Sequence, residues 1–280
     1  MLGCTYSLVA LGFTLIFGLL NLINLAHGEI MMVGAYVGLT TIVAFKLNIA
    51  FGILAAIVGT AIIGIIIYFF SIRYVERGGH LSPLISTIGV AIILQEAVTK
   101  IYTGEKIGFP ETFLARNIDL GWVSLNTVQA FIILFSLLIM ALFSVILKWT
   151  VIGKSIRAVS ENPLIASLLG VNVRWIVIAT FAIASMLAGI AGVLIGIAYH
   201  SIYPLMGIEI GLKGLAVIII AGMGNIYGAM VCGILLGLVE IFSTAYLSSS
   251  YKDAFAFGFM VLVLIIKPSG LFGTMEKRRA

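Results

Sequence analysis

The sequence Asn21-Leu-Ile-Asn-Leu-Ala-His-Gly-Glu29 interrupts an apolar stretch that otherwise extends from Leu8 to Phe45. That stretch is about twice the roughly 20 residues that cross a bilayer as one helix, and no proline divides it. The division instead falls on a cluster of Asn, His, Gly and Glu residues. Polar groups at membrane depth are costly and are therefore functional candidates. This polar break is either an embedded site or a hydrated turn at the membrane surface, and its spacing favours neither.

The composition is that of a polytopic membrane protein. Hydrophobic residues make up 62% of the chain and charged residues 10%, with a mean hydropathy of +1.23, whereas soluble domains carry roughly 25% charged residues. The chain therefore lies in a lipid bilayer. Its Lys and Arg residues are scattered between apolar runs, which excludes the clustered basic groove of a nucleic-acid-binding protein. Neither the two cysteines nor the three histidines have the spacing of a metal site.

The apolar runs predict an all-α bundle of transmembrane helices, because barrel strands would alternate over about ten residues. We expect about eight or nine membrane segments, of which 210–223 is short enough to be re-entrant or half-crossing. Small residues four positions apart, which let helices approach closely, occur as Gly34/Gly38, Gly192/Gly196, Gly207/Gly211 and Gly233/Gly237. The runs are 5–24, 28–45, 49–72, 83–103, 127–148, 176–199, 210–223, 227–247 and 253–267.

Loop charges predict the orientation, since cytoplasmic loops carry an excess of Lys and Arg. The 104–126 connection has balanced charges and is expected outside, with the N-terminus also outside and the C-terminus in the cytoplasm. Alternation then places the polar break toward the cytoplasmic half. The basic residues of the expected cytoplasmic segments are Arg73, Arg77, Lys148, Lys154, Arg157, Arg174, Lys267, Lys277, Arg278 and Arg279, against the acidic Glu76, Glu161 and Glu276.

No connection is long enough for a second domain, so residues 1–280 are predicted to form a single transmembrane domain. Gly153-Lys-Ser155 resembles the end of a nucleotide-binding loop, but position 148 is Lys where that motif needs Gly. Nothing in the sequence resembles an assembled catalytic triad. The sequence therefore predicts that the chain is no enzyme and holds no cofactor of its own.

The 150–175 loop contains a predicted short helix, 162–170, with both ends marked. Asn162 suits the N-cap, Pro163 the first helical position and Gly170 the residue after the C-cap. Between them, the i,i+4 pairs Leu164/Leu168 and Ile165/Leu169 form an apolar stripe. Such a stripe either packs onto the protein's own helices or docks in the groove of a partner.

Three carboxylates, those of Glu29, Glu96 and Glu240, fall within or beside apolar runs, and Gln95 adjoins the second. Membrane-embedded carboxylates relay protons, bind cations or join helices by hydrogen bonds. A proton- or ion-coupled secondary transporter, or a channel for a small polar solute such as urea or an amide, is therefore an alternative function.

Four segments carry a resemblance to a known family. The segment Leu15-Ile-Phe-Gly-Leu-Leu-Asn-Leu-Ile-Asn-Leu-Ala-His-Gly-Glu-Ile-Met-Met-Val-Gly-Ala-Tyr36 closely resembles the N-terminal signature of permease subunits of branched-chain amino acid ABC importers. The Gly-Lys-x-x-Arg-Ala segment with the residues up to Asn172 is similar too, as are Gly222-Met-Gly-Asn-Ile-Tyr-Gly-Ala229 and Tyr246-Leu-Ser-Ser-Ser-Tyr-Lys-Asp253. The chain departs from the family in beginning almost at its first span and in having Glu96 beside Gln95.

The resemblance implies a multi-pass permease subunit of the cell (inner) membrane, in an ATP-driven importer of branched-chain or related amino acids. Its expected partners are a second homologous permease, two cytoplasmic ATPases that carry ATP and Mg²⁺, and an extracytoplasmic substrate-binding protein. The polar candidates along the translocation path are Asn21, Asn24, His27, Gly28, Glu29 and Gln95, and those for coupling to the ATPases are Asn162, Pro163, Leu164, Ala166, Leu168 and Gly170. Within the polar break, an equally open expectation is structural: Gly28 allows the turn, while His27 and Glu29 bind freed backbone groups or a neighbouring helix.

Overall fold

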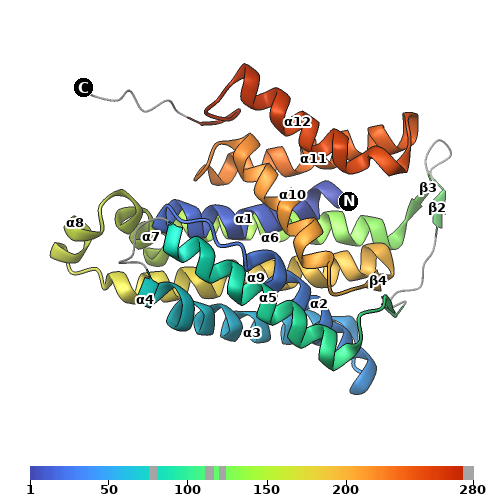
Figure 1. The fold of residues 1–280 in the computed structure, drawn as a ribbon, viewed down its shortest axis with the longest axis horizontal. Helices are drawn as coiled ribbons and strands as arrows, with labels where there is room; N and C mark the ends of the chain where they lie inside the picture. Colours follow the sequence, from blue (N-terminus) through green and yellow to red (C-terminus); the bar gives the residue numbers. More distant parts are fainter. Residues whose placement is uncertain (76–80, 111–116, 120–123, 274–280) are drawn as a thin grey trace.

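The computed structural model describes residues 1–75, 81–110, 117–119 and 124–273 (Figure 1). Two small antiparallel sheets, β1 with β4 and β2 with β3, accompany the helices. The elements are α1 (Leu2–Leu20), α2 (His27–Ala44), α3 (Ile49–Ile67) with a π-helical turn (Tyr68–Ile72), α4 (Arg73–Val75), α5 (Leu81–Tyr102), β1 (Ile107–Gly108), β2 (Asn117–Asp119), β3 (Ser124–Asn126), α6 (Thr127–Trp149), α7 (Val151–Glu161), α8 (Pro163–Leu168), α9 (Val173–Tyr199), β4 (Ser201–Ile202), α10 (Met206–Ala221), α11 (Ile226–Tyr246), a 3-10 turn (Ser249–Tyr251) and α12 (Lys252–Ile266).

The all-α membrane architecture predicted from the apolar runs is confirmed. Eight of the described helices are long and apolar enough to cross a membrane. The remaining apolar run, 210–223, forms α10, which begins at Met206, four residues before the predicted start, and has 16 residues. Its shortness agrees with the expectation of a half-crossing element. The prediction of a loop over 150–175 was wrong for the residues before 162, because Val151–Glu161 form the helix α7.

Helices α1, α2 and α9 form the core of the bundle. Helix α9 packs against α1, α2 and α3, while α1 also packs along α11. Most of the side chains of α1, α2 and α9 are buried, whereas few of those of α5, α6 and α12 are. A helix that is apolar all round is typical of a bundle interior. The peripheral helices expose apolar faces suited to lipid or to another membrane subunit.

Glycines allow the core helices to approach to backbone contact, as the small-residue pairs predicted. A Cβ atom added at Gly34 would lie 3.1 Å from the carbonyl oxygen of Gly189, and one at Gly192 would lie 3.0 Å from the nitrogen of Ala35. A Cβ atom at Gly233 would lie 2.6 Å from the nitrogen of Ser7. These atoms belong to backbone and cannot turn aside, so each position requires glycine.

The connections gather at two opposite ends of the bundle (Figure 1). Helices α4, α7 and α8 lie at one end, and the N-terminus and the strands β2, β3 and β4 lie at the other. This arrangement matches the grouping of loops inferred from charge. Of the charged residues used for that inference, Glu76, Arg77, Glu276, Lys277, Arg278 and Arg279 lie outside the described residues.

Candidate functional site

The polar break separates α1 from α2 inside the bundle. Helix α1 ends at Leu20, its C-cap residue Asn21 has a left-handed φ of 52°, and residues 21–26 are not helical. Helix α2 then begins beside the middle of α1, because the ring of His27 packs against that of Phe13 with a centroid distance of 4.6 Å. Asn24, His27 and Glu29 are buried, whereas Asn21 is exposed. A hydrated surface turn is therefore wrong for these three buried residues.

The expectation that Gly28 allows the turn was wrong. Asn21 makes the turn, as its left-handed backbone shows, and Gly28 lies inside the first turn of α2. There it faces α10, where a Cβ atom would collide with the carbonyl oxygen of Gly207 and lie 3.0 Å from the Cα atom of Gly211. Gly28 thus allows α2 and α10 to touch. The signal for this contact was the Gly207/Gly211 pair.

The polar side chains of the break are only partly satisfied. Asn24 accepts a hydrogen bond from the Ala26 N–H through Oδ1, at 3.1 Å. Within the described residues, the Oε2 atom of Glu29 and both ring nitrogens of His27 have no hydrogen-bond partner. The Val9 carbonyl faces the His27 ring without the geometry of a hydrogen bond. The expectation that His27 and Glu29 bind freed backbone groups or a neighbouring helix is therefore met only in its second part: His27 packs against Phe13 of α1, and Glu29 lies against Gly207 of α10.

The structure brings Glu29 and Gln95 to one cavity of about 190 Å³ between α1, α2, α5 and α10. Asn21 instead lines a separate cavity beside the α10–α11 turn. Glu96, next to Gln95, is exposed on α5. The residues that line the first cavity are Phe13, Leu25, Glu29, Ile88, Ala91, Ile92, Gln95, Gly207, Ile208, Gly211, Leu212 and Leu215. The polar residues predicted along the translocation path therefore do not form one site: Glu29 and Gln95 line one cavity, and Asn21 lines another.

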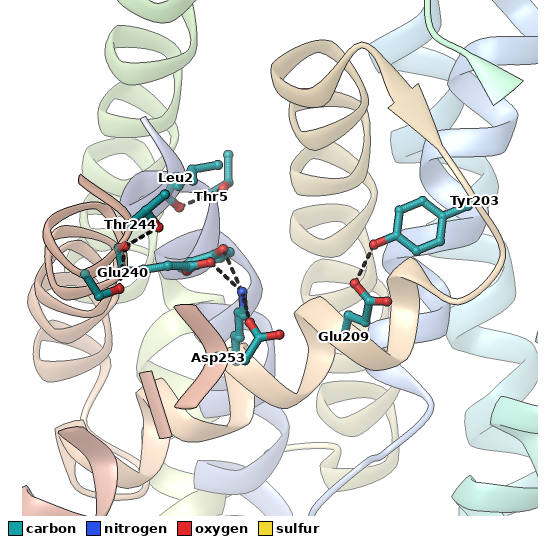
Figure 2. A network of polar contacts seen from close by, with 10 residues as sticks. Leu2, Thr5, Tyr203, Glu209, Glu240, Thr244 and Asp253 are labelled. Carbon is teal, nitrogen blue, oxygen red and sulfur yellow. Dashed lines mark hydrogen bonds and ion pairs between the residues drawn. The ribbon is translucent and has the colours of Figure 1, made fainter. Parts of the chain in front are cut away.

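An ion cluster with a buried pair, Lys213 and Glu240, and a half-exposed third member, Asp253, joins α10, α11 and the start of α12. Nζ of Lys213 lies 2.6 Å from Oε1 of Glu240 and 2.9 Å from Oδ1 of Asp253, and Figure 2 shows the two carboxylates reaching the same nitrogen. Lys213 also donates to the hydroxyl of Tyr6 at 3.4 Å. The sequence drew attention to Glu240 but not to Lys213. A lysine inside an apolar run is the signal that would have revealed the pair, because a charge at membrane depth requires a partner.

Helix α10 begins at a second polar group, near β4. The Tyr203 hydroxyl donates to the Glu209 carboxylate at 2.5 Å (Figure 2), and the ammonium of Lys106 lies 4.9 Å from the centre of the Tyr203 ring. Burial, followed by the hydrogen bond to Glu209, raises the pKa of Tyr203 above its ordinary value. The hydroxyl therefore stays protonated and able to donate at neutral pH.

The predicted short helix exists as α8 and is capped at both ends. Oδ1 of Asn162 accepts from the N–H groups of Leu164 and Ile165, both at 3.0 Å. At the other end Gly170 has a φ of +86°, and the N–H groups of residues 170 and 171 bond back to Ser167 and Ala166. These are the two hydrogen bonds of a Schellman motif. The helix is thus a defined rigid element.

The apolar stripe of α8 points away from the bundle. Leu164, Ile165, Leu168 and Leu169 are 70%, 54%, 79% and 78% exposed. Packing of this stripe onto the protein's own helices is therefore wrong for the described chain. Ala166, a candidate for contact with an ATPase, is 1% exposed and holds α8 against its neighbours instead. Asn162 and Gly170 act as caps.

Comparisons with known proteins agree with this architecture. A family model described as "Branched-chain amino acid transport system / permease component" matches residues 1–264. The high-affinity branched-chain amino acid transport system permease protein LivH of Escherichia coli K12 is 35% identical, over 98% of this chain and 93% of its own length. The corresponding BraD of Pseudomonas aeruginosa is 34% identical over the same shares. No solved structure matches the chain.

Both the family match and these relatives cover nearly the whole chain, including the polar break, α8 and the ion cluster. They support the role of an ABC import permease and do not favour a secondary transporter. Together with the eight apolar helices, they make the chain a multi-pass membrane protein. The chain therefore belongs to the permease components of branched-chain amino acid transport systems.

Proposed function

We propose that residues 1–280 form one permease domain that shares a translocation pathway for leucine, isoleucine or valine with a second, homologous permease. Two ATPases that bind ATP and Mg²⁺ dock at the end with α7 and α8, which is the cytoplasmic end. An extracytoplasmic binding protein delivers the amino acid at the opposite end, where the N-terminus lies. This chain itself holds no cofactor and catalyses no reaction.

The exposed stripe of α8 is the observation that carries the coupling part of this proposal. Four large apolar side chains project from a helix whose two ends are fixed by caps. An amphipathic helix of this kind binds by placing its apolar face in a groove of the partner. Arg157 of α7 also donates to the Leu147 carbonyl at the end of α6. Movement of a docked ATPase would thus reach the transmembrane helices through α7.

The test uses the complete complex of both permeases, the ATPases and the loaded binding protein in proteoliposomes. Leu164→Asp combined with Leu168→Asp is expected to release the ATPases and abolish ATP-driven leucine uptake, with the permease still inserted. Leu164→Met with Leu168→Met keeps the stripe apolar and should retain uptake. Retained uptake by the aspartate variant would contradict the coupling role of α8.

The alternative function predicts transport without ATPases. A secondary transporter would move leucine or urea when the chain is reconstituted alone with a pH gradient. We expect no flux under those conditions, and flux driven by the gradient alone would overturn the proposed dependence on ATP.

A further inference from the structure

The cavity between α1, α2, α5 and α10 combines an apolar wall with two polar side chains from different helices. Its apolar lining includes Ile88 and Ile92 of α5 and Leu212 and Leu215 of α10. Its volume is about 190 Å³, while an apolar cavity of about 150 Å³ is known to hold benzene. The space therefore suits a small aliphatic molecule.

Glu29 supplies the carboxyl group of this cavity. It is 1% exposed, and within the described residues its Oε2 atom has no hydrogen-bond partner. A buried ionised carboxylate without a partner is expensive. Polar groups retained at membrane depth mark substrate or ion pathways. The free oxygen of Glu29 therefore indicates a ligand that supplies a hydrogen-bond donor or a positive charge.

Helix α10 leaves room for that carboxylate. A Cβ atom added at Gly207 would collide with Oε2 of Glu29 and lie 2.6 Å from its Cδ atom. Gly28 of α2 and Gly211 of α10, which lies one turn after Gly207, bring the backbones of the two helices into contact. Three glycines thus fit α2 and α10 together around the Glu29 side chain. Gln95 lines the same cavity from α5 and provides an amide that both donates and accepts hydrogen bonds.

We propose that this cavity is an intramembrane binding site for a zwitterionic aliphatic amino acid, in which Glu29 receives the ammonium group and Gln95 the carboxylate. The isoleucine and leucine side chains of α5 and α10 line the part of the cavity that receives the branched aliphatic group. Pairing an ammonium with a buried carboxylate offsets the desolvation of both. This proposal rests on the proposed function, since it names the place in this chain that the transported amino acid occupies.

The test uses photo-leucine, a leucine that carries a diazirine and keeps its ammonium and carboxylate groups. It is supplied to the complete complex during ATP-driven turnover, and labelled peptides are identified by mass spectrometry. We expect label on α5 and α10, at Ile88, Ile92 or Leu212. Glu29→Gln should reduce this label and the uptake of leucine by roughly 10- to 100-fold, the range expected for a lost charge-assisted hydrogen bond.

Glu96→Gln is the matched control, because it removes a carboxylate from an exposed position on α5 next to Gln95. It should keep the label in the cavity. Gly207→Ala is a second test variant, which crowds the Glu29 carboxylate without changing charge and should also reduce the label.

The possible results distinguish a failure of the proposed binding site from a failure of the proposed transport function. Label on the binding protein but not in the cavity of the wild-type complex would overturn the site, as would undiminished label in Glu29→Gln. If the wild-type complex does not import leucine with ATP, the proposed function itself fails.

Discussion

Replacing Lys213 by methionine would remove the cation that Glu240 faces in the bundle. At an effective dielectric constant of about 20, unit charges at the 2.6 Å separation of Lys213 and Glu240 attract by about 6 kcal/mol. Desolvation of the two groups offsets much of this attraction. The loss of one partner is nevertheless severe, because Glu240 is 2% exposed and water cannot replace the ammonium. We expect Lys213→Met to lower the free energy of unfolding by about 3–5 kcal/mol.

The geometry of the cluster also predicts an order among variants. Glu240→Gln leaves Lys213 with Asp253 at 2.9 Å and should cost less than Lys213→Met. Asp253→Asn should cost least, because the Asp253 side chain is 56% exposed and exposed ion pairs contribute about 0–1 kcal/mol. The double variant Lys213→Met with Glu240→Gln removes both buried charges and should be more stable than Lys213→Met alone.

The free energy of unfolding would be measured by reversible titration of the purified chain with sodium dodecyl sulfate in mixed micelles, followed by circular dichroism. A double-mutant cycle gives the coupling between Lys213 and Glu240. The reasoning would be refuted if Lys213→Met proved no more destabilising than Asp253→Asn. Strictly additive losses in the double variant would refute it equally.

Three further predictions concern packing, capping and the start of α10. Gly192→Ala should destabilise the bundle by about 1–3 kcal/mol because its Cβ atom meets the backbone of α2, whereas Gly89→Ala, with open space at its Cβ inside α5, should be neutral or stabilising by up to about 1 kcal/mol in the same titration. Asn162→Ala should cost α8 about 1 kcal/mol through its lost cap, visible as faster amide exchange confined to α8. Since burial and then the bond to Glu209 raise the pKa of Tyr203 in the fold, the protonated side chain should stabilise the protein at neutral pH and lose that contribution as pH rises above the ordinary tyrosine range. Tyr203→Phe should remove this alkaline dependence from the melting temperature, and an unchanged dependence would contradict the assignment.

Much of the architecture was predictable from the sequence because lipid imposes a simple rule on the backbone. Every spanning segment must satisfy its own hydrogen bonds, so long apolar runs become helices. The ends of α8 were also predictable, because Asn162 and Gly170 cap the helix through contacts with residues less than two turns away in the sequence. The helix α7 was not predicted. Its charged residues Lys154 and Arg157 gave an amphipathic helix the composition of a basic loop.

The contents of the candidate site were less predictable because they depend on distant segments. Glu29 and Gln95 were both suspected, but only the fold shows that they share a cavity. Lys213 pairs with Glu240 and Asp253 on two later helices, and no local sequence pattern predicts such a pairing. Whether Gly28 makes a turn or a helix contact is likewise decided by the position of α10.

The start of α2 inside the bundle has a consequence for biogenesis. Its buried His27 and Glu29 are covered by α10 and by the middle of α1, and the rest of the helix packs on α9. Helices α9 and α10 leave the ribosome long after α2 has been made. During synthesis, α1 and α2 are therefore inserted before the helices that cover the polar groups of α2 exist. The bundle core can pack only once the second half of the chain has been inserted.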